Sequence, residues 1–255
     1  MRKLLDRLFS TPTEAPAAYA APAGCRIYAI GDIHGRADLL QQLRAMVAAD
    51  ARAGGETRNV VVYLGDYVDR GPASREVIDT LIDQPMAGCE EVFLLGNHEQ
   101  AMLQFLSDVT IGPSWMQFGG WATLRSYGIA MTPTEIRMPW LRVAQEQLNA
   151  RLPPRHLAFL RALKLTHAEG GYLFVHAGLR PGVALDAQNP DDLIWIRDEF
   201  LNSRVDHGKV VVHGHSISDQ VEMLDNRIGV DTGAYFTGRL SCVVLEASER
   251  RILQT

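Results

Sequence analysis

The sequence has few cysteines and no long apolar run. Its three cysteines, Cys25, Cys89 and Cys242, are too few and too scattered for a disulfide framework, and none has a metal-binding spacing. We therefore expect a protein of the reducing cytoplasm. No run approaches the roughly 20 apolar residues that are needed to cross a bilayer, so we expect no transmembrane segment.

Positive charge is scarce as well. The 25 lysines and arginines stand against 30 aspartates and glutamates, which gives a formal net charge of −5. Such a chain has no general attraction to nucleic acid or acidic membranes, and we expect neither as a partner. A hydrophobic content of 47% and a charged content of 22% are typical of a soluble globular protein, and 255 residues suit one α/β domain.

Residues 1–24 are expected to form a flexible N-terminal tail. Asp6 and Arg7 interrupt its apolar residues, so the segment does not resemble a secretory signal. The Ala/Pro-rich stretch after them favours a disordered tail over a short amphipathic helix on a tether. Residues 25–255 are then expected to form a single domain.

What the sequence does contain is five short polar blocks, each at the end of an apolar run. They are GDIHG at 31–35, GDYVDRG at 65–71, GNHE at 96–99, HAG at 176–178 and HGH at 213–215. Three- to five-residue runs of β-branched and aliphatic residues precede them, as in strands that are covered on both faces. Ligands of such sheets collect beyond the strand ends, so the blocks predict one shared site.

The Asp, Asn and His side chains of these blocks are the types that bind a pair of divalent cations. Two ions about 3.5–4 Å apart need a shared carboxylate, further oxygen or imidazole ligands, and open positions for water and substrate. Mixed oxygen and nitrogen ligands suit Mn, Fe or Zn better than an all-oxygen Mg or Ca site. In an extended segment, Asp32 and His34 point to the same side and can reach one ion. A single block is more often a turn, but five in this order indicate a metal centre.

The blocks closely resemble those of the phosphoprotein phosphatase family, in particular its small bacterial serine/threonine phosphatases within the calcineurin-like metallophosphoesterases. The resemblance extends from about Ile27 to about Leu245. It implies an α/β fold of the α+β type, with two mixed β-sheets packed as a sandwich and flanked by helices. It also implies a binuclear metal centre at one end of the sheets, with Mn²⁺ as the expected metal and Fe or Zn as alternatives.

The resemblance also implies a role for each matching residue. One ion would be held by Asp32 and His34, Asp66 would bridge both ions, and Asn97, His176 and His215 would hold the second. His98 would be the general acid that protonates the leaving oxygen, and Asp69 would fix its tautomer and keep it charged. Arg70 and Arg197 match the family's phosphate-clamping arginines, whose guanidinium forks suit phosphate oxygens, and Asn97 would contact the phosphate as well.

Three residues close to these motifs have competing interpretations. His213 is expected to support the site without binding an ion. Glu99 is expected to begin a helix whose dipole its charge complements. The alternative for Arg197 is a helix-surface arginine paired with Asp198 or Glu199, but we favour the phosphate clamp because surface helical ion pairs are weak.

The stretch from about 102 to 165 contains none of the blocks and is expected to be a helical insert. Its segment 115–128 is rich in aromatic residues, and one interpretation is a cap over the mouth of the site. We favour packing on the core for Trp115, Phe118 and Trp121, because a spacing of three residues is ordinary for a buried helix face.

The reaction implied is direct attack of a metal-bound hydroxide on phosphorus. The expected substrates are phosphoserine and phosphothreonine in a protein or peptide, with phosphotyrosine or small phosphomonoesters as further ones. A symmetrical diadenosine tetraphosphate hydrolase is the alternative, but those enzymes usually carry a small residue in place of Asp69. A catalytically inactive metal-binding interaction module is a third possibility, which the intact Asp69 and His98 disfavour. The sequence does not indicate an oligomeric state.

Overall fold

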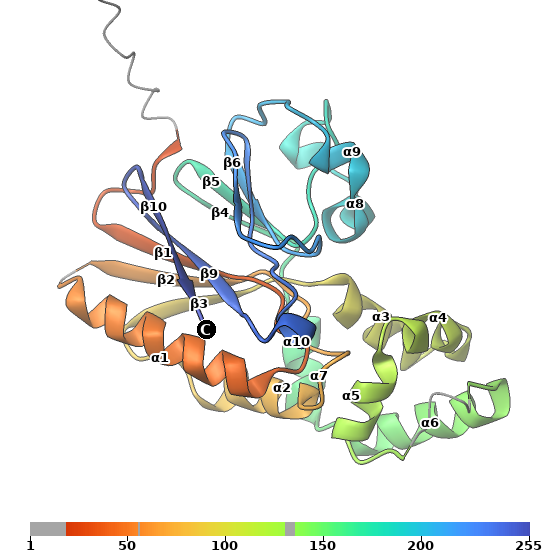
Figure 1. Cartoon of the computed structure of the whole chain (residues 1–255). Coiled ribbons are helices and arrows are strands. Elements are labelled where there is room, and N and C mark those ends of the chain that lie inside the picture. Colours follow the sequence, from red (N-terminus) through yellow and green to blue (C-terminus); the bar gives the residue numbers. More distant parts are fainter. Residues whose placement is uncertain (1–18, 56, 131–135) are drawn as a thin grey trace, which may run out of the picture.

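The computed structural model describes residues 19–55, 57–130 and 136–255, which contain two mixed β-sheets of five strands each (Figure 1). The first sheet has the order β10 (Glu249–Gln254), β9 (Ser241–Glu246), β1 (Cys25–Ile30), β2 (Arg58–Tyr63) and β3 (Cys89–Phe93). The second has the order β4 (Thr166–Glu169), β5 (Tyr172–Val175), β6 (Val210–His213), β8 (Arg227–Gly229) and β7 (Glu222–Met223). In each sheet three parallel strands adjoin antiparallel ones, so the expectation of two mixed sheets is confirmed.

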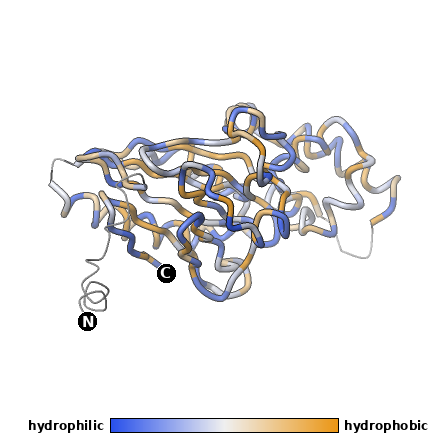
Figure 2. The backbone as a smooth tube through the Cα atoms, turned by 90° about the horizontal axis from the view of Figure 1, so that it is seen from above, coloured by the Kyte–Doolittle hydropathy of each residue, from blue (hydrophilic) through white to orange (hydrophobic). Residues whose placement is uncertain are grey.

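The two sheets pack face to face, and helices cover their outer faces. Along β1 the side chains alternate: Ile27 and Ala29 face the core between the sheets, while Tyr28 and Ile30 face the helical side. Both faces are buried, and the strand therefore consists of a continuous apolar run. Figure 2 shows hydrophobic chain concentrated in the middle of the molecule.

Different helices cover the two outer faces. Helices α1 (Ala37–Ala53) and α2 (Ser74–Asp83) pack on the first sheet, with Leu40 and Val77 among their buried residues. The short helices α8 (Pro190–Trp195) and α9 (Asp198–Leu201) lie on the second sheet, and η4 (Leu185–Ala187) precedes them in the chain. The short helix α10 (Ala234–Thr237) joins β8 to β9.

In its described residues the expected insert consists of helices joined by short connections, and it extends to one side of the sheets (Figure 1). It follows α3 and consists of short helices and two longer ones. Helix α3 spans Asn97–Phe105, and the elements of the insert are η2 (Val109–Ile111), α4 (Gly112–Gln117), α5 (Gly120–Ser126), α6 (Met138–Arg151) and α7 (Pro154–Arg161).

Part of the expected tail belongs to the folded domain. Ala21 is buried in the core between the sheets, and its N–H donates to the carbonyl oxygen of Ala247 at 2.9 Å. The N–H of Gly171 donates to the carbonyl oxygen of Ala20, also at 2.9 Å. The expectation of a flexible tail is therefore wrong for residues 19–24, because they bond to both sheets. The rest of that tail lies outside the described residues. None of the described helices is both long and apolar enough to span a membrane.

Candidate metal centre and active site

The five polar blocks meet at one end of the two sheets, in the loops that follow β1, β2, β3, β5 and β6. Two groups of buried side chains there have the geometry to hold an ion, with ligand atoms within 4.8 Å of one another. One group is His34, Asp66 and His98, and the other is Asp66, His176 and His215. Asp66 belongs to both, which is the position that a bridging carboxylate requires.

Two of these histidines are oriented as metal ligands. The Nδ1–H of His34 donates to the carbonyl oxygen of Val68 at 2.9 Å, and that of His176 to the carbonyl oxygen of Leu64 at 2.8 Å. Burial lowers the pKa of both imidazoles, so each is neutral with its lone pair on Nε2. Those Nε2 atoms lie 3.5 Å and 3.4 Å from the carboxylate of Asp66. Metal-binding histidines typically donate their other ring N–H to a carbonyl in this way.

Around His176 and Asn97, acceptor atoms face one another. Nε2 of His176 lies 3.0 Å from Oδ1 of Asn97, which in turn lies 2.9 Å from Nδ1 of His215. Burial lowers the pKa of His215 to about 2, so its ring is neutral too. A lone pair on His176 directed at the oxygens of Asn97 and Asp66 is unfavourable unless a cation lies between them. This donor set therefore fits a divalent ion.

Asp32 reaches the same centre but belongs to neither group. Its carboxylate accepts a hydrogen bond from the N–H of His215 at 3.0 Å. Burial, together with the charges of Asp231 and Asp66, raises its pKa well above the usual value. In the group that contains His34 and Asp66 the third side chain is that of His98, so the placement of Asp32 beside His34 stays a prediction. Burial and the neighbouring carboxylates disfavour ionisation of Asp32, and a divalent cation would favour its charged form.

Asp231 is a site residue that the sequence analysis missed. It is 2% exposed and accepts from the N–H of Gly233 at 2.9 Å, and burial raises its pKa to about 6. The same pattern that marked the other blocks is present here: β8 contains Ile228, and Val230 and Asp231 come directly after the strand. A search for carboxylates after every apolar run would have found it.

His98 and Asp69 form a buried pair. The Nδ1–H of His98 donates to Oδ2 of Asp69 at 2.7 Å, and its Nε2 lies 3.7 Å from Asp66. Burial lowers the pKa of His98, but the charges of Asp66 and Asp69 outweigh that effect and the pKa is raised. The Nε2 atom of His98 thus faces the metal-binding groups.

Asp69 is held from the helical insert. Its Oδ2 accepts from Nε1 of Trp115 at 2.8 Å, and its Oδ1 accepts from the hydroxyl of Thr123 at 2.5 Å. Trp115 is fully buried, so the packing interpretation is right for it, although the indole also has this polar role. That interpretation is wrong for Phe118, which is 40% exposed with its ring 6.1 Å from that of His98. The sequence analysis did not identify Thr123.

Glu99 lies in the first turn of α3, as expected, and its side chain has a second role as well. It is fully buried, and its carboxylate accepts hydrogen bonds from backbone N–H groups of the Asp66 loop and of Gly96, the N-cap of α3. The donors are Asp66 at 2.9 Å, Tyr67 at 2.8 Å, Val68 at 3.1 Å and Gly96 at 3.1 Å. Burial and the charge of Asp66 raise its pKa to about 8. Glu99 therefore fixes a loop, because its side chain turns inward and does not remain on the helix surface.

His213 lies outside both metal-binding groups. It is buried, its ring packs 5.1 Å from that of Phe200, and its Nδ1–H donates to the carbonyl oxygen of Gly214 at 3.0 Å.

The loops of the site have an unusual backbone. Five site residues have positive φ: His34 (45°), Asp66 (53°), Asp69 (71°), Arg70 (66°) and His215 (63°). Ala247 is the one other non-glycine residue with positive φ in the described chain. Such conformations cost on the order of 1–3 kcal/mol each and persist where the surrounding structure fixes them. Gly96 is needed for another reason, since a Cβ there would lie 2.1 Å from Oδ1 of Asp66.

The two arginines lie on either side of this centre. Nη2 of Arg70 is 3.4 Å from Nε2 of His98, and its guanidinium lies 4.7 Å over the ring of Tyr235. Arg197 donates from Nη1 to the carbonyl oxygen of His215 at 3.3 Å.

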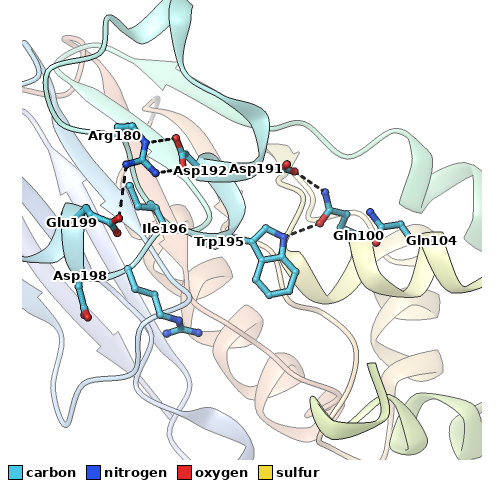
Figure 3. A pocket seen from close by; sticks show the side chains of 10 residues that line it. Gln100, Gln104, Arg180, Asp191, Asp192, Trp195, Ile196, Asp198 and Glu199 are labelled. Atoms are coloured by element: carbon cyan, nitrogen blue, oxygen red, sulfur yellow. Dashed lines mark hydrogen bonds and ion pairs between the residues drawn. The ribbon is translucent and has the colours of Figure 1, made fainter. Parts of the chain in front are cut away.

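Arg197 does not form the surface ion pair that was its alternative interpretation. Within the described residues it has no ion pair with Asp198 or Glu199, and Glu199 lies 3.8 Å from Arg180. Arg197 lines a cavity of about 620 Å³. Figure 3 shows two parts of its wall: Arg180 beside Asp192 and Glu199, and Trp195 bonded to Gln100.

Comparisons with known proteins agree with this geometry. The sequence model of a family described as calcineurin-like phosphoesterase matches residues 25–239. Serine/threonine-protein phosphatase 2 of Escherichia coli (strain K12) is 25% identical over 223 residues, which cover 84% of this chain and 90% of that protein. A symmetrical bis(5'-nucleosyl)-tetraphosphatase of Aromatoleum aromaticum is 31% identical over 156 residues, which cover 61% of this chain and 45% of that protein.

Among solved structures, that of a candidate diadenosine tetraphosphatase superposes with a TM-score of 0.60. The match covers 92% of this chain and 98% of that chain, at 21% sequence identity. At this identity the likeness establishes the shared fold alone.

Proposed function

This chain belongs to the calcineurin-like phosphoesterase family, and we propose that it is a metal-dependent phosphoprotein phosphatase. Its substrates are phosphoserine and phosphothreonine, with phosphotyrosine or small phosphomonoesters as further ones. The observation that carries the proposal is the 2.7 Å hydrogen bond between His98 and Asp69 beside Asp66. A relative that aligns over 90% of its own length, and is named a serine/threonine-protein phosphatase, supports the same choice.

The metal centre of the proposal contains two divalent ions, with Mn²⁺ as the expected metal. Asp32 and His34 would hold one, Asp66 would lie between the two, and Asn97, His176 and His215 would hold the other. The lone pairs of His176 and Asn97 that face each other support this set. When bound, such ions supply a nucleophile from water at neutral pH and neutralise charge on the phosphate.

The chain's own residues then bind the phosphate and protonate the leaving group. Arg70 and Arg197, on either side of the centre, donate guanidinium hydrogen bonds to the phosphoryl oxygens, and Asn97 contributes an amide. His98 gives the proton on its Nε2 to the leaving oxygen, while Asp69 holds the other nitrogen and stabilises the charged ring.

A symmetrical dinucleoside tetraphosphate hydrolase is the second candidate. It is supported by the 31% identity to a bis(5'-nucleosyl)-tetraphosphatase, although that match covers less than half of the relative. Asp69 argues against it, because the resemblance associates a small residue at that position with the dinucleotide enzymes. An inactive metal-binding module is the third, and the preserved set of ligands, His98 and Asp69 disfavours it.

A parallel measurement of kcat/KM with Mn²⁺ separates these candidates. The substrates are phosphoserine, phosphothreonine and phosphotyrosine peptides and diadenosine tetraphosphate. We expect phosphopeptides to be hydrolysed at least tenfold more efficiently than the dinucleotide. The reverse order would favour the second candidate, and absence of metal-dependent turnover on every substrate, including an aryl phosphate, would favour the inactive module.

A further inference from the structure

A basic cavity adjoins the site on the side of the helical insert. It has a volume of about 410 Å³ and is lined by Arg70, Pro72, Trp121, Ala122 and Arg125. A neighbouring cavity of about 350 Å³ shares Arg70 and Trp121 with it. Neither cavity is lined by an aspartate or glutamate.

Arg125 is fixed in this cavity and keeps its donors available. Its guanidinium lies 5.9 Å over the indole of Trp121, a contact that holds a cation through the ring face. The side chain is exposed, and in the described part of the chain no carboxylate lies within ion-pairing distance of it. A guanidinium stacked on a ring still presents the N–H groups along its edge, which match a carboxylate.

The cavity is close to the reacting centre. Arg70 connects the two, since it lines the cavity and its Nη2 lies 3.4 Å from Nε2 of His98. The backbone N–H of Arg70 also donates to the carbonyl oxygen of Gly119 at 3.2 Å, which ties the insert to the site. A substrate with its phosphate at Arg70 would therefore place neighbouring groups near Arg125.

The charge of this cavity contrasts with its surroundings. The whole chain has a net charge of −5, and the 620 Å³ cavity beside Arg197 is lined by four acids and two arginines. Those acids are Asp191, Asp192, Asp198 and Glu199. An anionic group of a substrate is thus repelled on one side of the centre and attracted on the other.

We propose that the Arg70–Arg125 cavity binds an acidic side chain of the phosphoprotein substrate, a few residues from the phosphorylated serine or threonine. This inference rests on the proposed function, because it takes the substrate to be a peptide. Arg125 is its specificity-determining residue, and Trp121 holds the Arg125 guanidinium in place. The insert, which supplies no metal ligand, thereby gains a function in substrate selection.

The test uses phosphoserine peptides of one sequence in which a glutamate or an alanine occupies each position from three before to three after the phosphoserine. We expect glutamate at one or more positions to raise kcat/KM roughly fivefold in the full-length, Mn²⁺-loaded protein, the scale of a partly exposed ion pair. This preference weakens as ionic strength rises, because salt screens exposed charges.

Substitution of Arg125 tests whether this cavity is the site that binds the glutamate of the peptide. Arg125→Ala should abolish the preference for glutamate and leave kcat/KM on the alanine peptides within about twofold, and Arg125→Glu should favour a lysine at the same position. Arg142→Ala is the matched control, because Arg142 is an exposed arginine of α6 in the same insert and lines neither cavity. It should keep the preference.

Three results would overturn the inference, and they differ in whether the proposed function also fails. The inference fails if phosphopeptides are hydrolysed with no dependence on glutamate, or if the preference for glutamate survives in Arg125→Ala. In both cases the cavity does not bind an acidic side chain of the substrate, but the proposed function still stands. If diadenosine tetraphosphate is hydrolysed and phosphopeptides are not, the proposed function fails together with the peptide occupant. Arg125→Ala removes an exposed side chain, so its folding is checked by an unchanged melting temperature.

Discussion

At the scale of single residues, the notable feature is the number of bonds that hold Asp69. Its two carboxylate oxygens accept from His98, Trp115 and Thr123. Of these three, only His98 is a reacting group in the proposed mechanism. Trp115 and Thr123 orient the carboxylate of Asp69, which in turn orients His98. A carboxylate held this way keeps the imidazole in one tautomer, with its free nitrogen on the side of Asp66.

His98→Ala should reduce the hydrolysis of an alkyl phosphate far more than that of an aryl phosphate. A general acid contributes on the order of 10² to 10⁴ in rate, and it matters most for a poor leaving group such as serine. The measurement is kcat on a phosphoserine peptide and on an aryl ester with an acidic phenol. Equal losses on both substrates would remove His98 from this role.

At the scale of the elements, loops are held in place by side chains from other helices. Glu99 of α3 accepts from three successive N–H groups of the loop after β2, which allows Asp66 its positive φ. Away from the metal centre, His156 of α7 joins two elements. Its Nε2–H donates to Asp79 of α2 at 2.9 Å, and its Nδ1 accepts from the hydroxyl of Tyr127, also at 2.9 Å.

His156 gives a pH dependence to the stability of this junction. Burial lowers its pKa below the usual value, although Asp79 opposes the effect. The unfolded chain takes up a proton at this residue near pH 6.5, whereas the folded protein takes it up only at a lower pH. Unfolding therefore becomes easier as the pH falls through that window.

We expect the free energy of unfolding in urea to fall between pH 7.5 and pH 5.5, and to fall less in His156→Gln. The quantity compared is the slope of the unfolding free energy against pH in the two proteins. Absolute values are not compared, because the substitution also removes buried contacts at neutral pH. The same slope in both proteins would show that His156 does not contribute.

At the scale of the whole molecule, the candidate centre joins the two sheets. Asp32, Asp66 and Asn97 follow strands of the first sheet, whereas His176 and His215 follow strands of the second. A bound ion would thus connect two layers that otherwise meet mainly through the apolar core between them. Ligands that bind only the folded state stabilise it, and this stabilisation rises with their concentration.

Mn²⁺ should therefore raise the melting temperature, and a chelator should reverse the change. At a concentration 100 times the Kd, the expected gain is about 2.7 kcal/mol. Asp66→Asn should lose both the gain and the bound metal measured by elemental analysis. Glu249→Gln, an exposed change at the start of β10, is the control and should retain both. Full metal occupancy in Asp66→Asn would contradict the bridging role.

The sequence by itself determined most of the polar residues at the centre, and its resemblance to a known family implied the two-sheet fold. Each block comes after an apolar run, and a strand buried on both faces needs such a run, so the position of Asp66 or His176 depends on local sequence. Asp231 also follows an apolar strand directly, so the same pattern predicts it, although the sequence analysis did not include it. Glu99 was correctly expected at the start of a helix, but helix position alone does not show whether a side chain turns toward solvent or toward a neighbouring loop.

Only the tertiary structure decided which side chains support the centre. Trp115 and Thr123 lie 46 and 54 residues after Asp69, and no spacing rule connects positions so far apart in the chain. Their contacts depend on how the insert packs against α2 and α3. The same packing placed Phe118 beside His98 and Arg125 beside Arg70, although the sequence showed only an aromatic helical segment there. The residues at the end of each strand are set by local sequence, whereas their neighbours in space are set by long-range packing.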